Sequence, residues 1–305
     1  MSAVITVALP VFAIIAVGFG AGRLSILTAS DAQALNKFVF RIAMPVALFG
    51  LTSRTAPPGI ADLSLAGAYG LAAAAAFIGA YFFSRSVFSL SGQEAGAHAF
   101  AATLGNAVFL GLPIALSVEG WARPFVILML IEGTLVIILG ALTITKRKSG
   151  GFAKALVGPA RNPLLAGTIF GFLVSIVGIE INGPVSTFID FVGRTAGPVA
   201  LFSLGLFLAT HRFPAASGVA GRVSAIAAVK MALLPLTALG LARLFGVDDP
   251  AALGALALFV FVPAGVTSFV MAEQNGIYQT ETAANLLATT VISLATISAV
   301  LWLLA

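Results

Sequence analysis

Long runs of hydrophobic residues recur along the chain and are separated by short polar segments. A helix of about 20 apolar residues crosses the hydrocarbon core of a bilayer. The pattern predicts ten membrane-spanning helices, at residues 4–22, 35–51, 63–87, 97–117, 125–143, 162–177, 184–209, 224–245, 251–271 and 282–304. Because Arg23 follows the first run instead of a small-residue cleavage site, we expect a retained helix and not a signal peptide.

Composition indicates an all-α integral membrane protein. Of the 305 residues, 60% are hydrophobic and only 9% are charged, and the mean hydropathy is +1.09. A soluble fold of this length would need more polar surface to cover its core. The chain has no cysteine, and its two histidines, His98 and His211, lie near expected helix ends. We therefore expect no disulfide, no metal site and no cofactor.

Basic residues are distributed unevenly between the two sides of the expected spans. The odd-numbered connections and their edges hold eleven of the 16 Lys and Arg residues, the even-numbered ones hold four, and Lys230 lies inside a span. The positive-inside rule then places both termini outside the cytoplasm, in a multi-pass protein of the inner (plasma) membrane. The net charge of +5 follows from this orientation, so no nucleic-acid partner is expected.

Several positions recur at an offset of 153 residues. The matching pairs are residues 45–49 and 198–202 (both PVALF), Pro10 and Pro163, and Gly18 and Gly171. Five helices per half is an odd number, so the second half would start from the opposite face of the membrane. Such inverted repeats give secondary transporters two shapes of similar energy. The alternative is that both halves reuse common membrane-helix sequences.

The repeat predicts the domain organisation. Residues 1–145 form a first five-helix repeat, residues 146–161 form a cytoplasmic connecting loop, and residues 162–305 form a second five-helix repeat. The basic residues of the connecting loop support its cytoplasmic side.

The fourth expected helix contains the stretch GNAVFLGLP, residues 105–113. Pro113 lacks a backbone N–H, and Gly105 and Gly111 lack a Cβ, so we expect this helix to kink or unwind here. Freed backbone groups cannot face lipid and must pack inside protein or line a polar cavity. Asn106 is the one side chain of this stretch that both donates and accepts strong hydrogen bonds.

The ninth expected helix has a comparable stretch, VPAGVTSF, residues 262–269. Two interrupted helices at matching positions indicate a transporter site near the bilayer midplane. Helix N-termini at such a site carry partial positive charge and favour an anion over a cation. Taken alone, each motif is also explained by a proline kink without a ligand.

Two charged residues lie inside expected spans: Glu132 in the fifth helix and Lys230 in the eighth. A charge at this depth costs about 3 kcal/mol even on lenient scales, so each should face a partner or water. Three interpretations stay open: a structural ion pair, proton coupling through Glu132, and a substrate-attracting field from Lys230. Arg41 and Asp190, near helix ends, are expected to reach the lipid headgroups.

Taken in order, several motifs resemble the auxin efflux carriers, which include the plant PIN-FORMED auxin transporters and a bacterial branch of malonate-transporter-like proteins. The resemblance covers the whole chain. Its motifs are ALNKFV (34–39) through Pro45, Gly105-Asn106 through Gly111-Leu112-Pro113, Arg161-Asn162-Pro163, LFSLGLF (201–207), Lys230 with Pro235, and PAGV (263–266) through FVMA (269–272).

The resemblance implies the ten-helix inverted-repeat fold of bile-acid symporters and sodium/proton antiporters. In that fold helices 1, 2, 6 and 7 form a scaffold that dimerises, and helices 3–5 and 8–10 form a mobile transport domain. The broken helices 4 and 9 cross at the site, and Asn106 matches the asparagine that receives the substrate carboxylate. The candidate substrate-binding residues are Asn106, Gly105, Gly111, Pro113, Pro263, Gly265, Thr267, Ser268, Pro45 and Leu48.

The chain departs from the family pattern in three places. Gly105 and Ser268 stand where prolines are expected, and the large hydrophilic central loop of the plant carriers is missing. These departures favour a smaller carboxylate over an aromatic substrate of auxin size.

The expected function is a secondary transporter of small organic carboxylate anions, auxin-like or malonate-like, that works by elevator-type alternating access driven by protons or membrane potential. The alternative is a sodium-coupled organic anion symporter of the same fold, although amides, hydroxyls and freed carbonyls are the only oxygen ligands near the crossing. No cluster of acid, base and nucleophile indicates an enzyme, and no ring of repeated polar positions indicates a channel. The expected partners are the carboxylate substrate, membrane lipid and a second copy of the chain bound through the scaffold.

Overall fold

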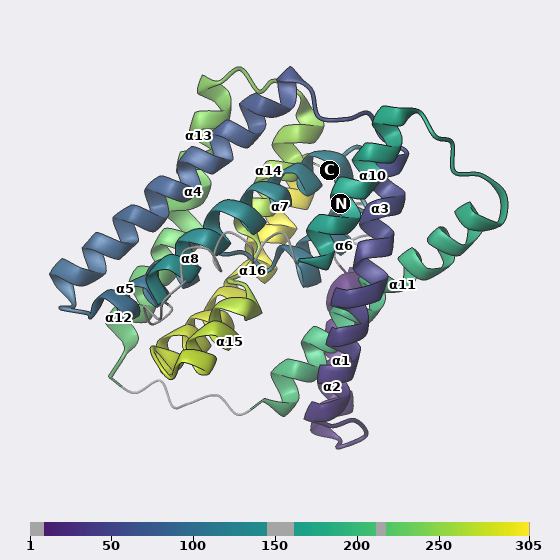
Figure 1. Cartoon of the computed structure of the whole chain (residues 1–305). Helices are drawn as coiled ribbons and strands as arrows, with labels where there is room; N and C mark the ends of the chain where they lie inside the picture. Colours follow the sequence, from purple (N-terminus) through teal and green to yellow (C-terminus); the bar gives the residue numbers. More distant parts are fainter. Residues whose placement is uncertain (1–8, 145–161, 212–217, 305) are drawn as a thin grey trace.

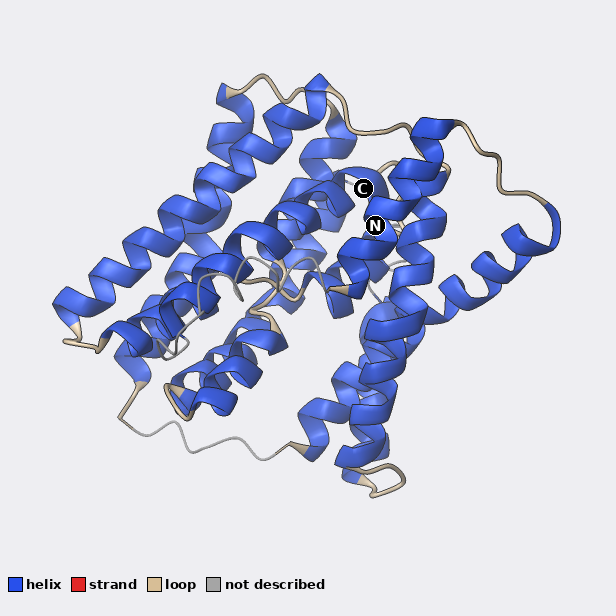
Figure 2. Ribbon diagram, in the orientation of Figure 1, coloured by secondary structure: helices blue, strands red, loops and turns tan. Residues whose placement is uncertain are grey.

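A computed structural model describes residues 9–144, 162–211 and 218–304, and the fold is all-helical over these residues. They contain no strand, only one isolated antiparallel bridge between Gly105 and Ala264 (Figure 2). The expected connecting loop at residues 146–161 lies outside the described residues.

Helices occupy the apolar ranges expected from the sequence where the structure describes them, with interruptions in the ranges 97–117 and 251–271; η marks a π-helical turn. In chain order they are α1 (Leu9–Arg23), α2 (Ala29–Phe38), η2 (Val39–Ala43), α3 (Met44–Ser53), α4 (Ile60–Val87), α5 (Gly92–Thr103), η3 (Ala107–Gly111), α6 (Leu112–Ala115), α7 (Ala122–Ile131), η4 (Glu132–Val136), α8 (Ile137–Ile144), α10 (Pro163–Val177), α11 (Gly183–Thr210), α12 (Ala220–Ala228), η5 (Val229–Leu233), α13 (Leu234–Leu244), α14 (Pro250–Phe261), α15 (Val266–Asn275) and α16 (Gln279–Leu304).

Six continuous helices in the described part of the chain are long and apolar enough to cross a membrane: Ala29–Ser53, Asp62–Val87, Ala122–Ile144, Gly183–Thr210, Ala220–Leu244 and Gln279–Leu304. Shorter apolar helices are Leu9–Arg23, Pro163–Val177 and Pro250–Phe261. This length and composition confirm the prediction of a multi-pass membrane protein.

Two helices begin five or more residues before their apolar runs because polar residues cap them. The helix that starts at Ala29 is preceded by Thr28, whose N–H donates to the Asp31 carboxylate over 2.8 Å. Ser91 and Glu94 exchange the two hydrogen bonds of a capping box ahead of α5. A count of apolar residues alone cannot detect these polar first turns.

Of the four π-helical turns in the described residues, three are followed two residues later by a proline: η2 by Pro45, η3 by Pro113 and η5 by Pro235. A proline in a helix has no N–H to donate and crowds the carbonyl one turn before it. The wider π turn accommodates both effects while the helix continues. The expected interruption of the fourth helix is confirmed at residues 104–106, between α5 and η3, whereas around Pro113 the chain stays helical, from Ala107 to Ala115.

Figure 1 shows two groups of helices. In one group α1 packs along α11, and α10 packs along α3. Gly18 lies directly against the backbone carbonyl of Phe202, and Gly171 lies against that of Phe49, with no room for a Cβ at either glycine. Both glycines and both phenylalanines are related by the offset of 153, so the two contacts are equivalent.

The second group surrounds α5 and α14. Most residues of these two helices are buried: residues 95–103 of α5, and Ala252 and residues 254–260 of α14. A helix that is apolar on all sides is stable only when other helices surround it. Both helices stop in the interior of the protein, and these two ends form the site described next.

Candidate functional site

Two helices are interrupted at the same place in the interior. Helix α5 ends at Thr103 and η3 begins at Ala107, while α14 ends at Phe261 and α15 begins at Val266. The two unwound stretches run antiparallel and exchange two backbone hydrogen bonds. The N–H of Asn106 donates to the carbonyl of Pro263 over 2.8 Å, and that of Gly265 donates to the carbonyl of Leu104 over 3.0 Å.

Side chains from two other helices bind the remaining amides of this crossing. The Gly105 N–H donates to Oε1 of Glu132 over 2.9 Å, and the Ala264 N–H donates to the hydroxyl of Thr289 in α16 over 3.1 Å. With these bonds, the amides of residues 105, 106, 264 and 265 all have acceptors. The N–H donors of the unwound backbone are thus satisfied inside the protein, as a low-dielectric environment requires.

Gly105 fits this crossing for two physical reasons. A Cβ at this position would lie 2.8 Å from Cγ2 of Val262, closer than real contacts allow. A proline would have no N–H to donate to Glu132. The glycine that departs from the family pattern is therefore matched to a carboxylate from the fifth span.

Glu132 and Lys230 are both buried, with 5% and 1% of their surface exposed. Glu132 also accepts a hydrogen bond of 2.9 Å from the hydroxyl of Tyr69. Lys230 Nζ donates to the carbonyl of Val260, in the last turn of α14, over 3.1 Å. A cation at a helix C-terminus is stabilised by the helix dipole. Within the described residues the two side chains make no direct ion pair, so each charge is held instead by one of the two helix breaks.

Asn106 caps the start of η3 and is 3% exposed. Its amide nitrogen Nδ2 is buried and has no hydrogen-bond partner among the described residues. A buried donor without an acceptor costs about 1–3 kcal/mol. Most buried polar atoms in proteins have a partner in the protein or in ordered water, so this donor stands out at the crossing.

A cavity of about 200 Å³ adjoins the crossing. Its walls come from η2 and α3, from α10, from the break after α5, and from the fifth span. Of the residues expected at the site, Gly105, Leu48, Thr267 and Glu132 line this cavity. Asn106 lies in the chain between Gly105 and Ala107, which both line this cavity.

The other expected binding residues have structural contacts. Pro263 supplies a carbonyl to the crossing, Gly265 caps α15, and the Ser268 hydroxyl donates to the Gly265 carbonyl over 2.7 Å. Gly111 packs against the ring of Phe125 without room for a Cβ.

Two of the expected residues lie away from the small cavity. The backbone of Pro45 packs on Gly167 of α10. Pro113 faces a second, larger cavity.

Sequence reasoning missed Thr289, which accepts a hydrogen bond from the crossing, and Tyr69, which donates one to Glu132. Both are polar side chains within apolar spans, and that signal could have been used. In α16, Asn285 lies one turn before Thr289, and its Nδ2 is 3.4 Å from the carbonyl of Ala101 in the last turn of α5.

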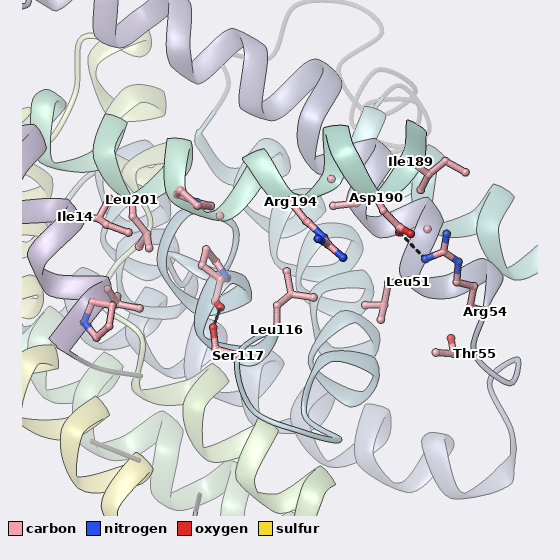
Figure 3. A pocket seen from close by; sticks show the side chains of 18 residues that line it. Ile14, Leu51, Arg54, Thr55, Leu116, Ser117, Ile189, Asp190, Arg194 and Leu201 are labelled. Atoms are coloured by element: carbon pink, nitrogen blue, oxygen red, sulfur yellow. Dashed lines mark hydrogen bonds and ion pairs between the residues drawn. The ribbon is translucent and has the colours of Figure 1, made fainter. Parts of the chain in front are cut away.

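The larger cavity has a volume of about 560 Å³ and lies between α1, α3, α6 and α11 (Figure 3). At its mouth Arg54 Nη1 contacts the Asp190 carboxylate at 2.6 Å, and its Nη2 donates to Ser186 over 2.9 Å. Asp190, which is expected to reach lipid headgroups, is partly exposed and bound to Arg54. We call the membrane face at which this cavity lies the Arg54 face.

At the far end of α11 the two groups of helices are in contact. The ring of His211 stacks on Phe207 and meets Phe269 of α15 edge-on, with centroids 4.9 Å and 5.0 Å away. His211 Nε2 lies 3.9 Å from Oε1 of Glu273, also in α15. We call this end the His211 face.

These features define a class: a multi-pass helical membrane protein with a polar, partly unsatisfied crossing of two interrupted helices in its interior. The family model described as membrane transport protein matches residues 3–153 and again residues 152–302. The chain belongs to this family, which is that of the auxin efflux carriers, and the resemblance seen in its motifs is confirmed.

The similar proteins are transporters by name. The chain is 27% identical to a protein of Rhizobium meliloti (strain 1021) named "Putative malonate transporter", over all of this chain and 97% of that protein. It is 27% identical to the "Uncharacterized transporter YfdV" of Escherichia coli (strain K12), over 76% of each chain. It is 28% identical to an uncharacterized transporter of Methanocaldococcus jannaschii, over 66% of this chain and 68% of that one.

Proposed function

We propose that this protein is a secondary transporter of small organic carboxylate anions. The observation that carries the proposal is the buried Asn106 Nδ2, which lacks an acceptor and lies at the crossing of the two interrupted helices. A carboxylate oxygen is the acceptor that this donor needs. The N-termini of η3 and α15 start at the same crossing, and their partial positive charge favours an anion.

Malonate is the first substrate to test. One similar protein is named for malonate, and the restricted cavity beside Gly105 suits a compact carboxylate better than an aromatic one. The oxygen Oε1 of Glu132 already accepts two hydrogen bonds, which lowers its repulsion of a bound anion. Lys230, whose Nζ would lie 3.5 Å from a Cβ placed at Gly105, contributes positive charge.

The transport mechanism that we propose is alternating access between a scaffold and a transport domain. The scaffold consists of α1, α2 with α3, α10 and α11, and also forms the homodimer; the other helices form the transport domain. Two observations support ten spans in inverted repeats: the equivalent contacts of Gly18 and Gly171 and the match of one family model to both halves. The open cavity on the Arg54 face and the contact on the His211 face correspond to one end state of such a cycle.

Uptake of radiolabelled malonate into proteoliposomes tests the proposal. We expect saturable uptake and counterflow in the wild type, and a loss of roughly 10- to 100-fold in uptake at low malonate for Asn106→Ala. Asn182→Ala, a change at an exposed loop asparagine, is the matched control and should transport normally. Wild-type uptake by Asn106→Ala would refute the site. Dependence on a sodium gradient, rather than on a pH gradient or membrane potential, would favour the sodium-coupled alternative.

A further inference from the structure

The larger cavity, on the Arg54 face, is lined by a positively charged side chain, Arg194, that takes no part in the crossing. Its walls are mostly apolar, and its charged groups are Arg54, Asp190 and Arg194. Arg54 is engaged by Asp190 and Ser186. Arg194 has no hydrogen-bond or ion-pair partner in the part of the chain that the structure describes, and Figure 3 shows its guanidinium pointing from α11 towards Leu116.

The charge balance of this cavity is positive. Two arginines face one aspartate; Asp190 is bound to Arg54 and is also attracted electrostatically by Arg194, so one positive charge remains in excess. Low-dielectric walls strengthen the field of a charge in a cleft and raise the local concentration of counter-ions by roughly 10-fold or more. A guanidinium also offers the forked donors that match a carboxylate.

The cavity leads towards the crossing but does not include it. Along α11, residues 190, 194, 197 and 201 follow helical spacing and line the same cavity. Gly197 faces Pro113, where a Cβ would lie 3.4 Å from the proline. The opposite wall, Pro113 to Ser117, continues the helix that starts at Asn106, and at 1.5 Å per residue Ser117 lies roughly 16 Å from Asn106. Arg194 lines this cavity, whereas Gly105 of the crossing lines the smaller one, so the two residues belong to separate cavities.

We infer that Arg194 is a separate anion-binding residue, which receives the carboxylate of the carried molecule in this cavity before it reaches Asn106. The apolar walls contact the carbon part of the ligand, as in most small-molecule sites. The identity of the anion rests on the proposed function. A phosphate of a lipid headgroup has the same charge chemistry and is separated from the carboxylate by the experiment.

Because the chain has no cysteine, a single introduced cysteine reports on this cavity. Leu116 lines the cavity and is 43% exposed. In Leu116→Cys we expect an anionic methanethiosulfonate reagent to react faster than a cationic one. Adding Arg194→Gln should lower the ratio of the two rates by roughly 10-fold, and Arg194→Lys should restore most of it.

The matched control is Arg243→Gln, which removes the same charge from an exposed position at the end of α13, away from the cavity. We expect it to leave the ratio unchanged. An equal ratio in the Arg194→Gln and parent proteins would overturn the inference, as would an equal fall in the Arg243→Gln protein.

Protection from labelling identifies the ligand. Malonate should slow the anionic reagent in Leu116→Cys but not when Arg194→Gln is added. Absence of protection by malonate, or protection only by phosphatidylglycerol vesicles, would overturn the assignment to a carboxylate. Failure of the proposed function has a different signature: malonate uptake is then absent in the wild type, while the dependence of the labelling ratio on Arg194 remains.

Discussion

The backbone amide of Gly105 donates to the carboxylate of Glu132 over 2.9 Å, and this bond joins the break in one helix to the middle of another. Both groups are buried. A buried carboxylate that loses a hydrogen-bond donor is poorly solvated. The charge of Glu132 is therefore stabilised by the helix break at Gly105, and the amide freed by that break is satisfied by Glu132.

Replacing Gly105 tests this dependence. Gly105→Pro removes the donor to Glu132, and Gly105→Ala places a Cβ 2.8 Å from Val262. We expect both to be destabilised by about 1–3 kcal/mol and to lose malonate uptake, measured by thermal unfolding in detergent and by proteoliposome assays. Gly221→Ala, where a Cβ meets open space, should behave like the wild type. Full stability of Gly105→Pro would show that the bond contributes nothing.

Glu132 variants separate its structural role from proton coupling. Glu132→Gln keeps an oxygen acceptor for Gly105 and Tyr69, whereas Glu132→Leu removes it. We expect Glu132→Leu to unfold at a clearly lower temperature than Glu132→Gln, since two buried donors lose their acceptor. Glu119→Gln, an exposed change, is the control. Equal unfolding temperatures for Glu132→Leu and Glu132→Gln would contradict the structural role. If uptake does not depend on pH in either the wild type or Glu132→Gln, proton coupling through Glu132 is excluded.

Lys230→Met tests the contact with α14. The ammonium is the donor to the Val260 carbonyl at the end of that helix. Because it also offsets the nearby charge of Glu132, its loss leaves a buried carboxylate with less compensation. We expect the Lys230→Met substitution to lower the unfolding free energy more in the wild-type background than in the Glu132→Gln background. A double-mutant cycle of unfolding free energies measures this difference. Additive effects would mean that the two charges do not interact.

Much of the fold could be predicted from the sequence because lipid imposes simple rules on length and composition. Apolar runs located the helices, and glycine with proline located both interrupted helices. The break after α5 was assigned partly to Pro113, but the chain opens at residues 104–106, which exchange backbone hydrogen bonds with Pro263 and Gly265 in the break between α14 and α15. The π turn η3 accommodates Pro113 without a break in the helix. Whether a π turn forms depends on backbone geometry, which residue types do not specify.

The candidate site was less predictable because its contacts join distant segments. Asn106 and Glu132 were identified from their rarity in apolar spans, yet their partners could not be assigned. Tyr69 binds Glu132 across 63 positions of sequence, and the bond between Arg54 and Asp190 spans 136. Helix packing determines which residues form such pairs. The local sequence pattern can therefore identify a polar residue but not its partner.

The contact on the His211 face predicts a cross-link that blocks transport. His211 belongs to the proposed scaffold and Glu273 to the proposed transport domain, and their side chains approach to 3.9 Å. In the cysteine-free chain, His211→Cys with Glu273→Cys should be joined by a short bis-methanethiosulfonate linker. If the two groups must separate here during each cycle, the linked protein should lose malonate uptake and regain it on reduction. Arg222→Cys with Glu281→Cys is the matched control, because this ion pair of 2.8 Å joins two helices within the proposed transport domain. Linked control protein should transport normally, and undiminished uptake by the linked His211–Glu273 pair would refute relative motion at this face.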